Sequence, residues 1–352
     1  MAYGVRDDFF EAPGHFSSGE RYWQIGSNPD VYLVSVPFPN VITKQTNCYV
    51  VRDGDEALLI DMGAPSDESF RVLLGVLDDL RIDVGAMSLF LTHLHLDHAG
   101  LVDRIIGAHQ RIYLSEVDFG YMCAAQKSSF HRALAARLRA EGCPADYGDI
   151  ARSYGMGVKS FDDRGRNLVF VGDGDVIKVG SHRLVVIDVE GHTPGHLALY
   201  EPQAGFLFSG DHVLYPMSPG LGFRCDRPCT MARYLSNLDK VNTLGVSLLC
   251  HSHGRLRRTF GERVEWLKSH HGQRIDAAAD LIARRFGPTG YEAVRSMRWN
   301  TKGKGFSGLL PVQRWVILEN GLVVLDHVVG EGLARREIDD EGAYRYLPPG
   351  RL

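Results

Sequence analysis

Long apolar segments are missing from this sequence of 352 residues, because no run approaches the roughly 20 apolar residues that span a bilayer. The first ten residues lack the basic and apolar regions of a secretory signal peptide, so no leader is predicted. Internal repeats and low-complexity tracts are also absent. These absences exclude a membrane-spanning, collagen-like or disordered protein.

Cysteine is scarce, with six residues and no Cys-x-x-Cys pair; Cys225 and Cys229 are the closest two. This spacing excludes a disulfide-rich scaffold and argues against a metal site built on cysteine. Reduced, buried thiols are typical of cytoplasmic proteins, and we therefore expect a cytoplasmic location.

The composition that remains is that of a globular protein, with 44% hydrophobic and 23% charged residues. The formal net charge of −4 is unevenly distributed, since residues 254–305 hold 12 Lys and Arg against 5 Asp and Glu, or +7, which leaves −11 elsewhere. A basic segment beside an acidic body can attract an anionic substrate, such as a CoA phosphate or RNA. The simpler alternative is a solvated helical face.

Short strands and hairpins broken by helices are predicted over the first 250 residues. Residues 116–156 interrupt this pattern with mostly helical sequence, which we interpret as an insertion that covers a site. Helical spacing dominates from residue 256, followed by two short strands within 333–347. We therefore predict a catalytic domain over 1–255 and a small helical, winged-helix-like domain over 256–352.

The strongest chemical signal is a run of three histidines and one aspartate directly after an apolar strand: His93, His95, Asp97 and His98. On extended backbone, His93 and His95 point to the same side, because side chains alternate with a period of two. Three imidazoles and a carboxylate so close together are typical ligands of zinc, and also of iron or manganese. The sequence therefore predicts a divalent-metal site.

Candidate ligands recur just past the ends of later strands, where a scaffold commonly presents reactive groups. They are His192, His196, Asp211, His251 and His253. Alone, each has an ordinary explanation as a loop or capping residue. Together with the first cluster, they indicate one shared centre.

With these motifs in their order along the chain, the sequence resembles the metallo-β-lactamase-fold hydrolase superfamily over about residues 25–255. The motifs that carry the resemblance are Leu59 to Gly63, the His93 cluster, Gly191 to His196, Ser209 to Asp211, and Ser252 to Gly254. The resemblance implies an α/β fold, a four-layer αββα sandwich with its metals at one edge of the two sheets.

The resemblance also implies a role for each site residue. His93, His95 and His192 would hold one metal, Asp97, His98 and His253 the second, and Asp211 would bridge the two. Asp61 would orient a ligand histidine, and His196 would lie behind the ligands. His251 remains an alternative to His253, which we favour because it directly precedes Gly254.

Such a site implies a dinuclear metal-dependent hydrolase, with zinc favoured and iron or manganese as alternatives. A hydroxide that bridges the two metals would attack a carbonyl, with Asp97 and Asp211 accepting its hydrogen bonds. A small-molecule thioester is the expected substrate, because a thiolate leaves without much protonation. The form of the Gly191–His196 motif resembles the glyoxalase-II-like branch, whose members often cleave acylglutathione, and residues 270–289 resemble the C-terminal extension of the lactamase-β-like-2 group.

Three alternatives stay open. A metal-dependent endoribonuclease or phosphodiesterase would use the basic segment, although the net charge is negative. A lactonase would place Tyr215 over the metals. Arg224, further along the same loop, is a separate candidate contact for an anionic substrate. A metal-binding sensor without turnover is the third. We expect no membrane contact, and a homodimer on general grounds.

Overall fold

The N-terminal part of the chain forms an eight-stranded sheet in the computed structural model, which describes residues 4–5, 21–39, 43–154, 160–285 and 287–350. Its strands follow the chain order and are β1 (Gly4–Val5), β2 (Tyr22–Ser27), β3 (Asp30–Pro37), β4 (Gln45–Asp53), β5 (Glu56–Ile60), β6 (Ser88–Phe90), β7 (Arg111–Leu114) and β8 (Asn167–Phe170). Strands β1 to β5 pair antiparallel and β5 to β8 pair parallel. The carboxyl ends of β5, β6 and β7 therefore meet at one edge.

A second sheet of five strands has the order β13-β12-β11-β10-β9. Its strands are β9 (Val176–Val179), β10 (His182–Asp188), β11 (Leu197–Glu201), β12 (Phe206–Gly210) and β13 (Leu248–His251). Three pairs are antiparallel and β12 pairs parallel with β13. The parallel pair brings the ends of β12 and β13 together, so that the loops which follow them are neighbours.

The main core lies between these two sheets. Alternate residues of β3, β4 and β5 face inward and are fully buried, as Val31 and Leu33 show. From the second sheet, Phe206 and Phe208 stack on one another with ring centroids 6.2 Å apart, and Tyr49 meets Phe208 edge to face at 5.3 Å. Because side chains alternate along a strand, the residues between the inward-facing ones face the outer side of the sheet, where those of β3 and β4 are also mostly buried.

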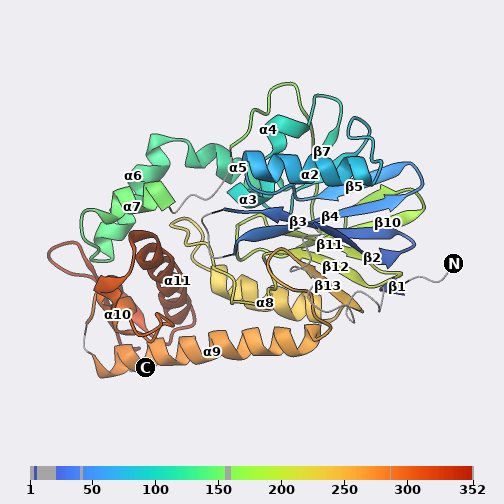
Figure 1. Cartoon of the computed structure of the whole chain (residues 1–352). Helices are drawn as coiled ribbons and strands as arrows, with labels where there is room; N and C mark the ends of the chain where they lie inside the picture. Colours follow the sequence, from blue (N-terminus) through green and yellow to red (C-terminus); the bar gives the residue numbers. More distant parts are fainter. Residues whose placement is uncertain (1–3, 6–20, 40–42, 155–159, 286, 351–352) are drawn as a thin grey trace. The chain divides into compact units, whose positions relative to one another are not determined.

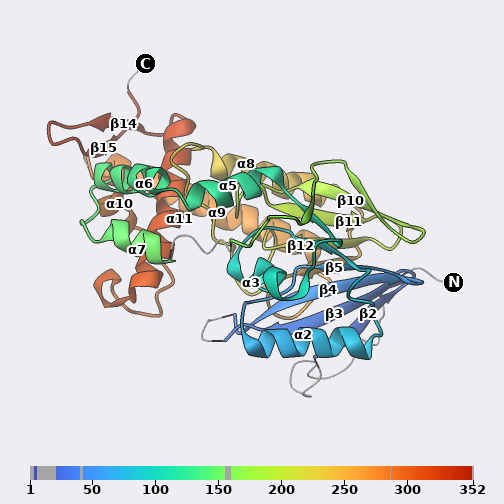
Figure 2. The same ribbon diagram turned by 90° about the horizontal axis from the view of Figure 1, so that it is seen from above.

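Helices cover the outer faces of the sandwich (Figure 1). Helix α2 (Asp67–Asp79) lies on the first sheet, capped by Ser66, whose side chain accepts the Ser69 N–H. On the second sheet, residues 237–242 of helix α8 (Thr230–Asn242) contact the end of β10, because Asn237 donates to Glu190 O and Lys240 to Asp188 O. Viewed from above, α2 runs along β2 to β5 (Figure 2). The expected four-layer αββα order is confirmed.

Short helices α3 (Leu96–Ala99) and α4 (Val102–Ile105) follow β6. The insertion that we predicted over 116–156 contains α5 (Glu116–Ala125), α6 (Ser128–Ala140) and α7 (Tyr147–Tyr154), and its last two residues lie outside the described residues.

Residue contacts divide the chain into two compact units. The first consists of Met1–Met122, Val158–Pro219 and Asn237–Val264, and the second of Cys123–Gly157, Gly220–Ser236 and Glu265–Leu352. The second unit therefore has a different extent from the 256–352 that the sequence suggested, since it takes in most of the helical insertion. One contact that joins the insertion to the rest of this unit is the ion pair between Arg137 of α6 and Asp326 of α11, at 2.7 Å.

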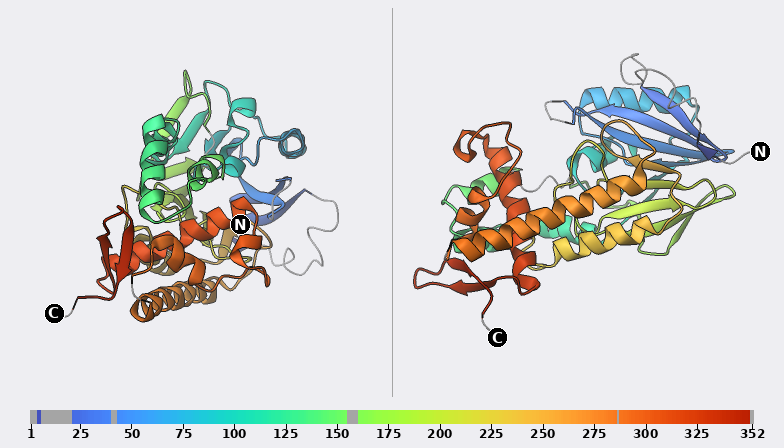
Figure 3. Two further views of the ribbon diagram at one scale, coloured as in Figure 1. Left: turned by 90° about the vertical axis from the view of Figure 1, so that its left-hand side faces the viewer. Right: turned by 90° about the horizontal axis from the view of Figure 1, so that it is seen from below.

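The remaining elements of the second unit are helical, as expected, with one small hairpin (Figure 3). They are α9 (Phe260–Arg284, whose first residues belong to the first unit), α10 (Gly290–Ser296), a 3₁₀ turn (Phe306–Gly308), α11 (Pro311–Gly330), and strands β14 (Arg335–Ile338) and β15 (Tyr344–Leu347). Thr289 caps α10 in a capping box with Glu292. Among the described residues, none of these helices is long and apolar enough to span a membrane.

Candidate metal centre

The predicted site residues follow the ends of four strands in the first unit. His93, His95, Asp97 and His98 follow β6, His192 follows β10, Asp211 follows β12, and His253 follows β13. These strand ends lie at the same edge of the two sheets, so residues 160 positions apart in the sequence become neighbours. The structure thus brings together all seven side chains that the sequence singled out as ligands.

One group consists of His93, His95 and His192. His95 Nδ1 lies 3.0 Å from His93 Nε2 and 2.8 Å from His192 Nε2. Three ring nitrogens therefore converge on one point. Three converging imidazoles are a set that zinc commonly uses.

A second group consists of Asp97, His98 and His253. Asp97 Oδ2 lies 3.6 Å from His98 Nε2 and 3.4 Å from His253 Nε2. Asp211 joins the two groups, because its Oδ2 is 3.5 Å from His192 Nε2 while its Oδ1 is 3.3 Å from His253 Nε2. One carboxylate thus faces both groups.

These separations fit bound cations. Ligand atoms about 2.0–2.1 Å from a tetrahedral zinc stand roughly 3.3 Å from one another, and the distances above scatter around that value. In addition, His98 Nε2 and Asp211 Oδ1 are buried without a hydrogen-bond partner among the described residues, and they lie 3.7 Å apart. Burying two such atoms is costly unless another group satisfies them. The clusters can therefore hold metal ions.

Asp61 is a buried carboxylate that contacts Thr92 and His98 and orients the His98 ring. Its Oδ1 accepts the Thr92 N–H at 2.9 Å, and its Oδ2 lies 2.8 Å from both Thr92 Oγ1 and His98 Nδ1. With Nδ1 of His98 directed at this carboxylate, the other ring nitrogen faces the second group. The orienting role that the sequence suggested for Asp61 is consistent with this geometry.

Two further contacts orient the second group. Gln45 O lies 3.0 Å from His253 Nδ1, and Thr46 Oγ1 donates to Asp97 Oδ2 at 2.9 Å. Neither residue is predictable from the sequence, since a backbone carbonyl has no side-chain signature and Thr46 precedes Asp97 by 51 positions.

Burial and charge act differently on the two groups. Burial, together with His98, holds the pKa of His93 well below its usual range, and burial also lowers that of His95, so both rings are neutral as metal ligation requires. Burial alone would lower the pKa of His98, but Asp97 and Asp61 outweigh it and raise this pKa to about 10. The carboxylates thus create a negative potential that favours a cation.

Other predicted residues lie apart from the two groups. His251 Nε2 faces Arg255 O at 3.2 Å and is in neither group, so the geometry favours His253. His196 is fully buried, with its ring 4.6 Å from that of His93. The hydroxyl of Tyr215 donates to Arg257 O at 3.1 Å. Arg224 belongs to the second unit and pairs with Asp226 through two contacts, of 2.8 and 2.6 Å.

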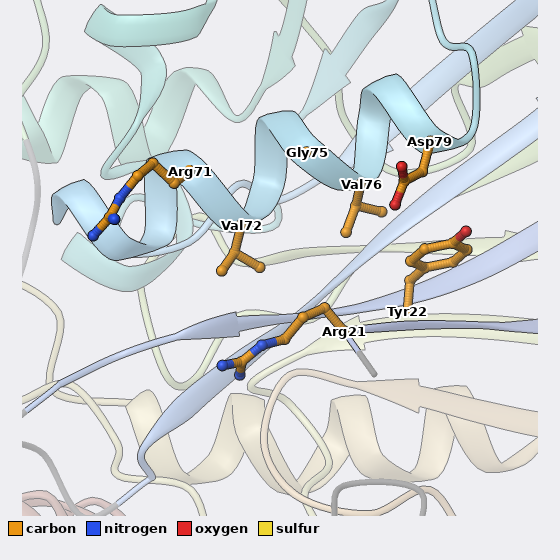
Figure 4. Close-up of a pocket in the computed structure, with 7 residues that line it drawn as sticks. All are labelled: Arg21, Tyr22, Arg71, Val72, Gly75, Val76 and Asp79. Carbon is orange, nitrogen blue, oxygen red and sulfur yellow. The ribbon is translucent and has the colours of Figure 1, made fainter. Parts of the chain in front are cut away.

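A groove elsewhere in the first unit has a different character (Figure 4). It has a volume of about 560 Å³ and is lined by Arg21, Tyr22, Arg71, Val72, Gly75, Val76 and Asp79. The lining contains neither histidine nor cysteine. The candidate metal ligands of this unit lie at the sheet edge instead.

Comparisons with known proteins agree with this geometry. A model of the metallo-beta-lactamase superfamily matches residues 41–253. The structure is similar to that of a metallo-beta-lactamase family protein from Thermus thermophilus, with a TM-score of 0.74 and 25% identity, covering 90% of this chain and 98% of that one.

Two relatives are similar in sequence. An uncharacterized protein from Aquifex aeolicus (strain VF5) is 29% identical over 177 residues, which are 49% of this chain and 68% of the relative. A hydroxyacylglutathione hydrolase from Erythrobacter litoralis (strain HTCC2594) is 51% identical over 43 residues, which are 12% of this chain and only 17% of that enzyme.

Proposed function

Because this chain belongs to the metallo-beta-lactamase superfamily, we propose that it is a dinuclear metal-dependent hydrolase of small-molecule thioesters, of the acylglutathione or acyl-CoA type. The observation that carries the proposal is the convergence of two ligand groups on one shared carboxylate, Asp211.

Two divalent cations, with zinc the favoured element, would be held by these groups. His93, His95 and His192 would hold one, Asp97, His98 and His253 the other, with Asp211 between them. When bound, such cations lower the pKa of a coordinated water and polarise a substrate carbonyl.

The chain's own residues would then position and orient the reactants. Asp97 and Asp211 offer carboxylate oxygens that accept a proton from an attacking water, and both are largely buried, at 9% and 7% exposure. Thr46 fixes Asp97 by donating to its Oδ2, and Asp61 fixes His98. A thiolate needs little protonation to leave, so this acceptor-rich site suits a thioester.

Support for a thioester comes from two sources. The Gly191–His196 segment has the form expected of acylglutathione-cleaving enzymes, and a hydroxyacylglutathione hydrolase is among the sequence relatives. A lactonase role for Tyr215 gains no support, since its hydroxyl is bonded to Arg257 O. The basic segment over residues 254–305, with its charge of +7, supports an RNA substrate less strongly than these two observations support a thioester.

Metal removal and reconstitution test the proposal. Purified protein is stripped with a chelator, refilled with zinc, and assayed for thiol release from acylglutathiones and acyl-CoAs. We expect two metals per chain by elemental analysis, no turnover when stripped, and recovery on refilling. His93→Ala should lower kcat/KM by more than the 10–100-fold that loss of an outer partner costs.

The matched control is His109→Ala, which removes an exposed histidine outside the cluster and should leave turnover unchanged. Full activity of the stripped protein would refute a metal mechanism. Metal binding without turnover of any ester, lactone or RNA would instead favour a sensor.

A further inference from the structure

A buried carboxylate contacts the loop that contains His192. Asp118, in the first turn of α5, is only 1% exposed. Its Oδ2 accepts from Thr193 Oγ1 at 2.7 Å, and its Oδ1 accepts from the Gly195 N–H at 2.7 Å. Hydrogen bonds to a charged carboxylate are stronger than neutral ones.

We propose that Asp118 is a positioning residue for the metal ligand His192, so that the start of the insertion helix sets the affinity of the His93–His95–His192 group. This inference rests on the proposed function, because it requires that the group binds a divalent cation.

The geometry of the loop supports this role. The two ends of the loop are bonded to each other, because the Val189 N–H donates to His196 O. The second end is also bonded to the segment after β6, because the Leu197 N–H donates to Thr92 O. Between these ends, Asp118 bonds to Thr193 and Gly195, the first and third residues after His192. The carboxylate thus restrains the middle of the loop next to the ligand.

Close packing against the helix N-terminus reinforces the restraint. A Cβ atom on Gly195 would lie 2.3 Å from Ser115 Oγ and 2.5 Å from Asp118 N, so only glycine fits here. Ser115 Oγ in turn accepts the Val117 and Asp118 N–H groups at the start of α5. A carboxylate in the first turn is also stabilised by the helix dipole. Helix and loop therefore form one rigid junction.

His192 has little freedom to move without losing its partners. Its Nε2 is 2.8 Å from His95 Nδ1 and 3.5 Å from Asp211 Oδ2. Ligand geometry must hold within about 0.5 Å for full metal affinity. Removing Asp118 should therefore weaken the first group and leave the Asp97–His98–His253 group nearly unchanged.

Titration with Co²⁺, followed by its visible absorption and by chelator competition, tests the proposal without any substrate. Asp118→Ala should weaken one of the two cobalt sites by about 10–100-fold, the usual cost of losing an outer partner. Thr193→Val should cause a smaller loss, and Thr193→Ser, which keeps the hydroxyl, should restore affinity.

Glu201→Ala is the matched control. Glu201 is also 1% exposed, and its Oε2 accepts the Ala204 N–H at 2.7 Å, but it holds a turn outside the metal groups. It should reduce thermal stability in chelator about as much as Asp118→Ala does, with unchanged cobalt affinity. A double variant, Asp118→Ala with His192→Ala, should bind cobalt no more weakly than His192→Ala alone, because both changes act through one ligand.

The outcomes separate the two proposals. If the wild type binds no cobalt, the proposed function fails and this inference fails with it. If the wild type binds cobalt and Asp118→Ala binds it equally well, or weakens both sites alike, only the positioning role is overturned.

Discussion

Asp61 shows how a single residue can set the protonation pattern of a candidate metal ligand. It adopts a left-handed backbone conformation with φ of 56°, and only 2% of it is exposed. This conformation is tolerated by aspartate and asparagine better than by most other residues. Its carboxylate accepts hydrogen bonds from two groups of Thr92 and lies against His98 Nδ1. When a metal displaces the proton on Nε2, the remaining ring proton of His98 would therefore stay on Nδ1, directed at Asp61.

Asp61→Asn should weaken zinc binding by about 10–100-fold, even though it preserves size and backbone preference. The asparagine NH₂ group can donate to His98 Nδ1, which moves the ring proton to Nε2 and blocks ligation. Asp61→Ala removes this bias, so its loss should be no larger than that of Asp61→Asn. Zinc affinity is measured by chelator competition.

Asp175→Asn serves as the control, because this exposed carboxylate merely accepts the Gly172 N–H in a turn. Wild-type zinc affinity in Asp61→Asn would contradict the orienting role.

Local spacing explains which site residues were predictable. His93, His95 and His98 lie within six positions of one another, and the later candidates repeat the same strand-to-loop pattern. Asp118 gave no such signal, because its contact with Thr193 joins residues 75 positions apart in the sequence. Polar contacts of this kind depend on the folded arrangement.

At the scale of elements, glycines in two helical segments have opposite packing. Gly75 lies on an exposed face in the middle of α2, and a Cβ there would meet nothing within 4 Å (Figure 4). Gly100 ends α3 with an ordinary helical φ of −63°, but a Cβ there would lie 2.4 Å from Leu96 O and 2.6 Å from Gly63 O. Backbone preference favours alanine at both positions, and only sterics distinguish them.

Gly75→Ala should therefore stabilise the chain by about 0.5–1 kcal/mol, the usual difference between the two residues inside a helix. Gly100→Ala should destabilise it by about 1–3 kcal/mol, because backbone oxygens must move to make room. Denaturant midpoints in the presence of chelator measure both effects apart from metal binding. An equal stabilisation by both substitutions would show that the backbone around Gly100 has room for a methyl group.

Element boundaries were predictable where local signals are strong. Ser66 and Thr289 are side-chain caps, as serine and threonine commonly are, and α2 and α10 begin directly after them. The apolar spacing of residues 101–108 is consistent with one helix over that range, but α4 ends at Ile105. Ile106 is extended and buried, at 4% exposure. Packing thus overrides propensity at that end.

At the scale of the whole molecule, the two units differ in their buried charges. The first unit gathers carboxylates around histidines, whereas the second contains a half-buried acid on α11. Burial raises the pKa of Glu319 to about 8, and Oε1 of this residue accepts the Phe223 N–H at 3.2 Å. Asn320, the next residue, accepts the Leu221 N–H at 3.1 Å. The two side chains attach residues 221–223 to the helix.

This pKa makes the stability of the second unit fall as pH rises. In the unfolded chain a glutamate ionises near pH 4.3. Below that pH, Glu319 is protonated in both states and has no effect. Between about pH 4.3 and 8, only the unfolded state loses the proton, so the free energy of unfolding decreases. Each pKa unit corresponds to about 1.4 kcal/mol, and since the side chain is partly exposed we expect a loss of about 2 kcal/mol.

Glu319→Gln should remove this loss, because glutamine stays neutral and its oxygen can still accept the Phe223 N–H. Hydrogen exchange of peptides from α11 should show equal protection of wild type and variant near pH 4.5, and greater protection of the variant near pH 8. Glu331→Gln, at the exposed end of the same helix, controls for the loss of one carboxylate. Parallel pH profiles for wild type and Glu319→Gln would mean that Glu319 ionises in the folded chain as readily as in the unfolded one. In that case the hydrogen bond from the Phe223 N–H, rather than the proton on Glu319, would determine how firmly residues 221–223 are attached to α11.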